Sequence, residues 1–333
     1  MRVLIIGGTG LISVGIIKHL LARGADVTMF NRGKRPSTVP ASVKHLVGDR
    51  NDTSFARFFS GRPFDVVIDM ICFSPAQAEA SVRAFSERCE HFIFCSTVCT
   101  YGVKVPPNVL VDETFAQEPI SEYGKNKLLC EQIFRRADES GKFNTTIIRP
   151  SHTYGPGAPL IDHLELDPTS WDRIERGQPV LCGGDGLGLW VATHRDDVGK
   201  LFAYAAMDSK TFGQSYNATR DEIFTWRDYY RDVASAMGKR AQVILMPAEW
   251  IAAHDPKRFG LLREITQYHG AYSSEAAKRD VPAFRCEIDF FDGAVETLKD
   301  ARGRGAWRSS VDDALYDAMV KNALSAGVEP VEL

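Results

Sequence analysis

Three side chains have types and spacing that suit proton transfer at an alcohol or ketone: Thr97, Tyr123 and Lys127. Tyr123 and Lys127 are four residues apart, so on a helix they lie on one face. A free tyrosine has a pKa near about 10, and a neighbouring ammonium lowers it. We therefore expect Tyr123 to move the proton during hydride transfer, Lys127 to acidify the phenol and Thr97 to hold the substrate oxygen. Such a Tyr–Lys pair also occurs on ordinary surface helices, so the prediction depends on the surrounding elements.

A glycine-rich turn near the N-terminus predicts a dinucleotide site. It follows the apolar run Val3–Ile6 and opens the helical pattern Leu11–Arg23. Glycine lets the backbone approach a pyrophosphate, and the N-terminus of the helix stabilises its charge. Ser13 replaces the third glycine of the usual fingerprint and is still small. The residues expected around the pyrophosphate are Gly7, Gly8, Thr9, Gly10, Leu11 and Ile12.

The end of the second predicted strand bears on the choice of cofactor. An acidic residue there usually holds the ribose 2′-hydroxyl of NAD, whereas this chain has Asn31 followed by Arg32. Arg32, backed by Lys34 or Arg35, suits the 2′-phosphate of NADP(H), which we favour over NAD(H). The alternative is a solvated basic loop.

Three further residues are expected at the cofactor: Asp49, Arg50 and Met70. Asp49 follows the third predicted strand and either meets the adenine edge or only forms a turn. Arg50 is its neighbour, and Met70 follows the fourth predicted strand.

Strands alternate with helices over the first half of the chain, which predicts a doubly wound parallel sheet of the Rossmann type. The expected strands are 3–6, 26–30, 44–47, 65–69, 92–95, 145–149 and 214–218, and the expected helices are 11–23, 76–87, 121–140, 225–237 and a last one toward Leu324, capped by Ser309 or Ser310. Residues 1–155, with returning segments at about 190–220, should form the dinucleotide-binding domain. About 156–189 and 221–333 should form a smaller substrate-binding lobe.

Composition narrows the class of protein. The chain has 333 residues, 44% of them hydrophobic and 25% charged, with a net charge of −3 and no basic block. We therefore expect a globular protein without a nucleic-acid partner. The seven cysteines have no paired zinc spacing and suit a reducing compartment. With no apolar run long enough for a bilayer and no room for a signal peptide, we expect a cytoplasmic protein without a metal.

Taken together, these stretches resemble the extended short-chain dehydrogenase/reductase superfamily, in its NAD-dependent epimerase/dehydratase branch. The resemblance covers about residues 1–240. It rests on GGTGLIS (7–13), FIFCSTVCTYG (92–102), YGKNK (123–127), IIRPSHTYGPG (147–157), GGDG with HRDDV (183–198) and SYNATRDEIFTW (215–226). It implies Thr97, Tyr123 and Lys127 as catalytic residues, and it implies that the backbone from Pro150 through His152 to Thr153 meets the nicotinamide.

Two departures from that family bear on the substrate. Nucleotide-sugar members usually carry an arginine four residues after GDG that grips the pyrophosphate, and this chain has Trp190, with Arg195 further along as a possible substitute. The acid pair that drives sugar dehydration is replaced by Val98-Cys99, so we do not expect elimination. The residues expected nearest the substrate are Thr97, His152, Trp190 and His194, although a structural role is the alternative for both histidines and for Trp190.

Three functions follow as hypotheses. The first is an NADP(H)-dependent oxidoreductase acting on a sugar or similar carbonyl compound. The second is a sugar epimerase that retains its cofactor, and the third is a relative of plastid RNA-binding proteins without redox chemistry. A homodimer formed through the helix of Tyr123 is also expected, by way of Leu128, Leu129, Ile133 and Phe134 unless these face the sheet.

Overall fold

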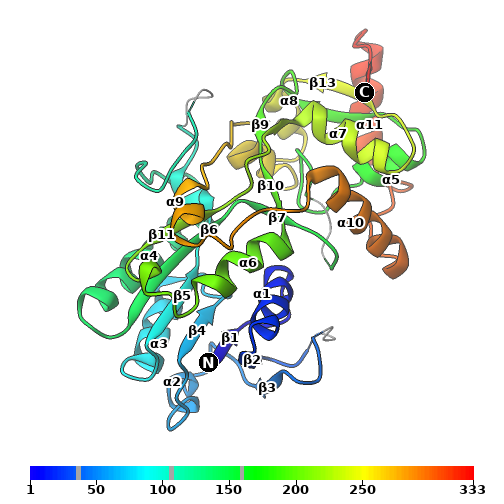
Figure 1. Cartoon of the computed structure of the whole chain (residues 1–333). Helices are drawn as coiled ribbons and strands as arrows, with labels where there is room; N and C mark the ends of the chain where they lie inside the picture. Colours follow the sequence, from blue (N-terminus) through cyan, green and yellow to red (C-terminus); the bar gives the residue numbers. More distant parts are fainter. Residues whose placement is uncertain (35–38, 105–108, 158–160) are drawn as a thin grey trace.

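The structure is a computed structural model that describes residues 1–34, 39–104, 109–157 and 161–333. Within these ranges the chain builds a seven-stranded parallel sheet in the order β3-β2-β1-β4-β5-β6-β11 (Figure 1). The strands are β1 (Arg2–Ile6), β2 (Asp26–Asn31), β3 (Lys44–Val47), β4 (Val66–Asp69), β5 (His91–Cys95), β6 (Asn144–Pro150) and β11 (Ser215–Ala218). The strand order reverses beside β1, so the predicted doubly wound Rossmann-type fold is confirmed.

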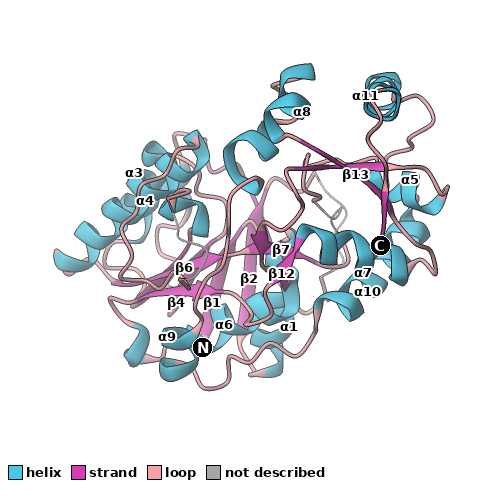
Figure 2. Ribbon diagram, turned by 90° about the horizontal axis from the view of Figure 1, so that it is seen from above, coloured by secondary structure: helices cyan, strands magenta, loops and turns pink. Residues whose placement is uncertain are grey.

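Alternate residues of the buried strands face opposite layers of helices. In β1, Val3 and Ile5 join the apolar cluster under α1, α6 and α9, whereas Leu4 and Ile6 join the cluster under α2, α3 and α4. Figure 2 shows these two layers on either side of the sheet. The helices are α1 (Leu11–Ala22), α2 (Phe55–Phe58), α3 (Pro75–Phe85), α4 (Glu122–Glu139), α6 (Arg195–Ala205) and α9 (Glu275–Asp280). A strand buried on both faces needs apolar residues at every position, which is the pattern that the sequence carries.

The remaining elements form a second, smaller lobe beside the sheet (Figure 1). Its strands are β7 (His152–Tyr154), β8 (Val180–Gly183), β9 (Leu189–Trp190), β10 (Ala192–His194), β12 (Phe224–Thr225), β13 (Gln242–Met246) and β14 (Val331–Glu332). Its helices are α5 (Ser170–Glu175), α7 (Trp226–Ala236), α8 (Ala248–His254), α10 (Phe290–Arg304) and α11 (Ala314–Ser325). Two apolar clusters fill it, one around Trp226 and one around Leu262.

Several expectations about the second half of the chain need correction. The last helix begins at Ala314 and is capped by Asp313, whose side chain accepts from the Tyr316 amide, so neither Ser309 nor Ser310 is the cap. Carboxylates and hydroxyls serve equally well as caps, which is why the sequence alone chose the wrong one. The lobe is also not continuous from residue 221, because α9 returns to the sheet and packs Ala277 on it. The cap at Thr225 is present as predicted.

The four apolar residues named for a dimer contact on α4 are divided between the sheet and the surface. Ile133 and Phe134 are buried against the sheet, while Leu129 is 45% exposed and Leu128 is half-buried. Among the described helices, none combines the length and the apolar character needed to cross a bilayer.

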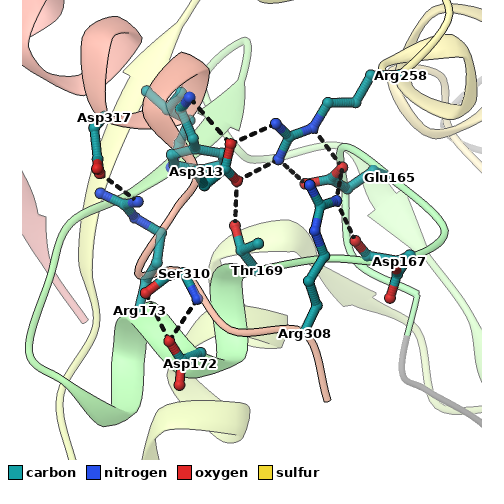
Figure 3. A network of polar contacts seen from close by, with 12 residues as sticks. Glu165, Asp167, Thr169, Asp172, Arg173, Arg258, Arg308, Ser310, Asp313 and Asp317 are labelled. Carbon is teal, nitrogen blue, oxygen red and sulfur yellow. Dashed lines mark hydrogen bonds and ion pairs between the residues drawn. The ribbon is translucent and has the colours of Figure 1, made fainter. Parts of the chain in front are cut away.

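A chain of ion pairs stabilises the lobe (Figure 3). The Arg258 guanidinium donates to both Glu165 oxygens at 2.7 and 2.8 Å and to both Asp313 oxygens at 2.6 Å. Thr169 donates to Asp313 as well, at 3.0 Å. Arg258 thereby joins the start of α11 to the segment before α5. Buried charge pairs whose hydrogen bonds are all satisfied fix one arrangement of the segments that carry them.

Beside this network, Asp162 is a buried carboxylate without a cation. Its Oδ1 accepts from the Leu164 and Glu165 amides at 2.8 and 2.9 Å, whereas Oδ2 has no partner among the described residues. Burial, reinforced by the charge of Glu165, raises the pKa of Asp162 to about 7 from its ordinary value of 3.8. The folded protein therefore keeps the Asp162 proton over a pH range in which the unfolded chain has lost it.

The unfolding free energy should consequently fall as the pH rises from about 4 to about 7, since the folded state binds more protons there. We expect Asp162→Asn to remove this penalty and to stabilise the protein by about 2–4 kcal/mol at pH 8, with the gain vanishing toward pH 4. Urea denaturation across that range measures it. Asp312→Asn, at an exposed position, is the matched control. A gain for Asp162→Asn that does not vary with pH would contradict the assignment.

Candidate functional site

The first turn of α4 is fixed against the end of β5. The Ser121 hydroxyl accepts from the Gly124 amide at 3.1 Å and caps the helix. A β-carbon at Gly124 would come within 2.5 Å of the Cys99 carbonyl oxygen, so only glycine lets the helix approach this closely. Thr97 begins the short 3₁₀ turn Val98–Tyr101 and accepts from the Cys99 amide at 3.2 Å. The two elements thereby bring Tyr123 beside Thr97.

The Tyr123 phenol is not acidified in this structure. Although the residue is 44% exposed, desolvation around its hydroxyl raises the pKa of Tyr123 above its ordinary value of 10, and a hydrogen bond with Thr97 only partly opposes this. Lys127 is not among the groups that shift the pKa of Tyr123 here, so its acidification of the phenol stays a prediction. A phenol is protonated at neutral pH whether its pKa is ordinary or raised, so in the direction of reduction Tyr123 has a proton to give to a ketone oxygen.

Lys127 is held by the main chain. Its ammonium is buried and donates to the carbonyl oxygens of Cys72 and Cys95, each at 2.8 Å. It lies 5.7 Å from the centre of the Tyr123 ring and 4.6 Å from that of Phe73. An ammonium has three donors, so one remains for another acceptor beside Tyr123.

A buried ion pair lies directly behind these residues. Arg149 donates to both oxygens of Glu131, at 2.9 and 2.7 Å, and both side chains are about 1% exposed. Ser96 donates to Glu131 at 2.5 Å, and Arg149 also donates to the Tyr101 hydroxyl at 2.7 Å. The pair therefore fixes the residue before Thr97 and the end of the turn that follows it.

A pocket of about 420 Å³ opens in front of Thr97 and Tyr123. Its floor is the carboxyl end of the sheet, where Pro150 ends β6 and Ser151 through Thr153 follow it. Its far wall is the segment 261–272, which contains the π-helical turn Leu262–Thr266. Such turns are rare and often occur at functional sites. The pocket is thus placed where ligands bind in doubly wound folds.

His152 and Trp190 line this pocket and bond to each other, because the Trp190 indole N–H donates to His152 Nδ1 at 3.1 Å. His194 and Arg195 do not reach it. His194 is 1% exposed and caps α6, accepting from the Asp196 amide, and the Arg195 guanidinium donates to the Pro156 carbonyl. Of the four residues expected near the substrate, the structure therefore brings three together and leaves His194 outside.

A second hollow, also of about 420 Å³, follows the glycine-rich turn along the same edge of the sheet. Gly7 has φ +115°, and a β-carbon there would come within 2.9 Å of Ile71 Cγ2 and 3.3 Å of Met70 Cβ. The next element, α1, starts with Leu11 and Ile12 after Gly10, with no side chain capping its first amides. Free amides at a helix start suit a pyrophosphate, so these residues fit the dinucleotide.

Gly8 has a packing role in the same turn, since a β-carbon there would come within 2.4 Å of Met29. Of the residues expected at the pyrophosphate, Gly7, Thr9 and Gly10 line the second hollow.

The outer end of this hollow is formed by the residues after β2 and β3. Asn31, Arg32, Lys34 and Asp49 line it, while Arg35 lies outside the described residues. Asn31 Oδ1 accepts from the Gly33 amide and pairs with His45, and its buried Nδ2 donor has no partner among the described residues. Arg50 also lines the hollow but is committed to Asp69, at 2.7 Å. This end therefore offers an amide donor and two cations after β2, together with the Asp49 carboxylate after β3.

The sequence model of the NAD dependent epimerase/dehydratase family matches residues 3–218, about two thirds of the chain. The chain belongs to this family. The predicted resemblance is thereby confirmed, and so is the prediction of an enzyme of the short-chain dehydrogenase/reductase type, an oxidoreductase or epimerase with a nicotinamide dinucleotide as its cofactor.

Individual relatives have different activities. The chain is 27% identical over 286 residues to 2'-dehydrokanamycin reductase of Streptomyces kanamyceticus, covering 86% of this chain and 80% of that protein. It is 26% identical over 342 residues to the chloroplast stem-loop binding protein of 41 kDa b of Arabidopsis thaliana, covering 97% and 85%. The fold is shared with UDP-glucose 4-epimerase of Thermus thermophilus in complex with NAD, at TM-score 0.72 and 23% identity, over 91% of this chain and 99% of that one.

Sequence reasoning missed two parts of the site. Glu131 follows Lys127 by four residues, as Lys127 follows Tyr123, so helical spacing alone places all three on one face. The wall residues Ile265, Tyr268 and Tyr272 carried no usable signal, because neither the π-helical turn Leu262–Thr266 nor the irregular segment after it has a regular apolar period.

Proposed function

We propose that this protein is an NADP(H)-dependent oxidoreductase that transfers a hydride at a hydroxyl or keto carbon of a sugar-like substrate. The observation that carries the proposal is the Tyr123–Thr97 pair, which lines a pocket on the same sheet edge as the glycine-rich turn. The similarity to 2'-dehydrokanamycin reductase supports net reduction of a sugar-type ketone.

The nicotinamide, when bound, supplies or accepts the hydride. Thr97 and Tyr123 hold the reacting oxygen, and in the direction of reduction Tyr123 gives its hydroxyl proton to that oxygen as the carbon becomes an alcohol. The phenol is protonated at neutral pH, so the proton is available when the substrate oxygen gains charge. Lys127, fixed by two carbonyl oxygens, has one remaining donor with which it would hold the ribose of a bound cofactor.

NADPH is the expected reductant because the outer end of the second hollow carries Arg32, Lys34 and an unpartnered Asn31 amide but no carboxylate for a ribose hydroxyl at the end of β2. We expect NADPH to bind at least about tenfold more tightly than NADH and to be consumed with a keto sugar. Arg32→Ala should remove most of that preference without changing the dissociation constant of NADH. Lys239→Ala removes an exposed charge in the lobe and is the control. Fluorescence titration and NADPH absorbance measure both effects.

Equal or tighter binding of NADH would overturn the cofactor proposal. The same experiment separates the other two functions. A sugar epimerase, as the similarity to UDP-glucose 4-epimerases suggests, would interconvert its substrate with no net consumption of NADPH. A counterpart of the chloroplast stem-loop binding protein would shift RNA in a gel at moderate salt and reduce nothing. A homodimer and a cytoplasmic location remain predictions.

A further inference from the structure

The pocket in front of Tyr123 has almost no charge. Glu264 is the one ionised side chain among its described lining residues, and its carboxylate already accepts from Arg263 at 2.9 Å. The nearby arginines already have acceptors: Arg149 pairs with Glu131, Arg195 donates to the Pro156 carbonyl, and the exposed Arg263 pairs with Glu264. A diphosphate placed here would lose its water and would gain a cation only by breaking one of these pairs.

Trp190 is held rigidly in the wall of this pocket. Its ring lies 4.9 Å from that of Trp226, and a β-carbon at Gly270 would come within 3.3 Å of its edge. Phe224 pairs with it across the short β9–β12 ladder. Trp190 is only 8% exposed, so it forms a fixed wall that cannot swing aside for a larger head group.

The bond from Trp190 also sets the tautomer of His152. Since the indole N–H donates to Nδ1, that nitrogen is the acceptor and the proton of the neutral ring is on Nε2. Nε2 is buried and has no partner among the described residues. Burial lowers the pKa of His152 to about 4, which keeps the ring neutral over the physiological range. His152 therefore presents one uncharged donor beside Pro150, at the floor of the pocket.

We infer that the site takes an uncharged, non-phosphorylated hydroxy or keto compound, whose oxygen next to the reacting carbon accepts from His152 Nε2, and that the bonded His152–Trp190 pair excludes nucleoside diphosphate sugars. This inference rests on the proposed function for the reacting carbon, but the exclusion of diphosphates does not depend on turnover. The exclusion of diphosphates would distinguish this chain in ligand choice from the structural neighbours crystallised with UDP-sugars.

The exclusion is tested by calorimetry on the full chain loaded with NADPH, with UDP-glucose and UDP as the probes. We expect no binding up to about 1 mM, and a dissociation constant for either probe below about 100 μM would overturn the inference. Leu166→Arg adds a guanidinium at a lining position that is 60% exposed, so folding should be unaffected, and we expect at least about a tenfold gain in UDP binding. No gain in that variant would mean that missing charge is not the barrier, which also overturns it.

The role of His152 is tested with uncharged methyl keto-hexopyranosides as substrates. We expect His152→Ala to raise KM about tenfold with kcat nearly unchanged, and His152→Gln, which keeps an N–H donor, to recover most of the loss. Trp190→Phe keeps an aromatic wall but loses the indole N–H, and ¹⁵N spectra should then show that His152 no longer has a single tautomer. Unchanged KM in His152→Ala would contradict the role of His152.

The possible outcomes separate this inference from the proposed function. If NADPH is consumed only with UDP-sugars, the redox function stands and the inference falls. If UDP-glucose does not bind and no carbonyl compound consumes NADPH, the exclusion stands and the proposed function falls.

Discussion

Tyr123→Phe is expected to lower kcat by about 10²–10⁴-fold while leaving NADPH binding unchanged. The substitution removes only the phenolic O–H, which interacts with Thr97, and it keeps the ring that packs 5.7 Å from the Lys127 ammonium. Without that hydroxyl the substrate oxygen gains charge as the hydride arrives and has no proton donor. The lost step lies in the transition state, so kcat should fall much more than KM rises.

The measurement is single-turnover NADPH oxidation with the best uncharged keto sugar. Tyr204→Phe is the matched control, because Tyr204 lies on α6, where its ring packs under Arg23, away from the pocket. Tyr123→Phe should melt within a few degrees of the parent protein. Such a result would exclude unfolding as the cause of the lower kcat. A kcat within tenfold of the parent protein would remove Tyr123 from the mechanism.

Arg149→Met is expected to cost about 3–5 kcal/mol of unfolding free energy, because it leaves the Glu131 carboxylate buried without its cation. Only Ser96 and Gln117 would remain as donors to that carboxylate among the described residues. Urea denaturation measures the loss, and Arg136→Met, at an exposed position on α4, the helix that carries Glu131, is the control.

The double variant Arg149→Met with Glu131→Leu separates charge from packing. Replacing both partners by apolar side chains removes the stranded charge, so most of the lost stability should return. Activity should not return with it, because Ser96 then has no acceptor at Glu131 and the Thr97 turn loses its support. If the single variant were as stable as the parent protein, the buried pair would not be what fixes this turn.

The sheet and the chemistry at its edge could be predicted because both are local in the sequence. Val3–Ile6 is apolar throughout and runs into Gly7, and Tyr123 and Lys127 are one helical turn apart. Each pattern lies within a few consecutive residues. Right-handed crossovers then restrict how successive parallel strands are arranged.

The parts that could not be predicted depend on contacts between distant residues. The Trp190–His152 bond spans 38 residues, and Arg258 meets Glu165 across 93. Whether Lys127 acidifies Tyr123 or binds carbonyl oxygens depends on the ends of β4 and β5, which no spacing rule describes. Such pairs need coordinates, because nothing in the chain near one partner specifies the other.

The two carbonyl oxygens that hold Lys127 have a consequence for which side chains positions 72 and 95 can carry. Those oxygens belong to the peptide units of Cys72 and Cys95, whose thiols are buried and take no part in holding the ammonium. The position of the ammonium is thus determined by the path of the backbone and not by the side chains of residues 72 and 95. Any small side chain that fills the same volume can therefore replace the cysteines at positions 72 and 95, and Lys127 will still donate to the same two carbonyl oxygens.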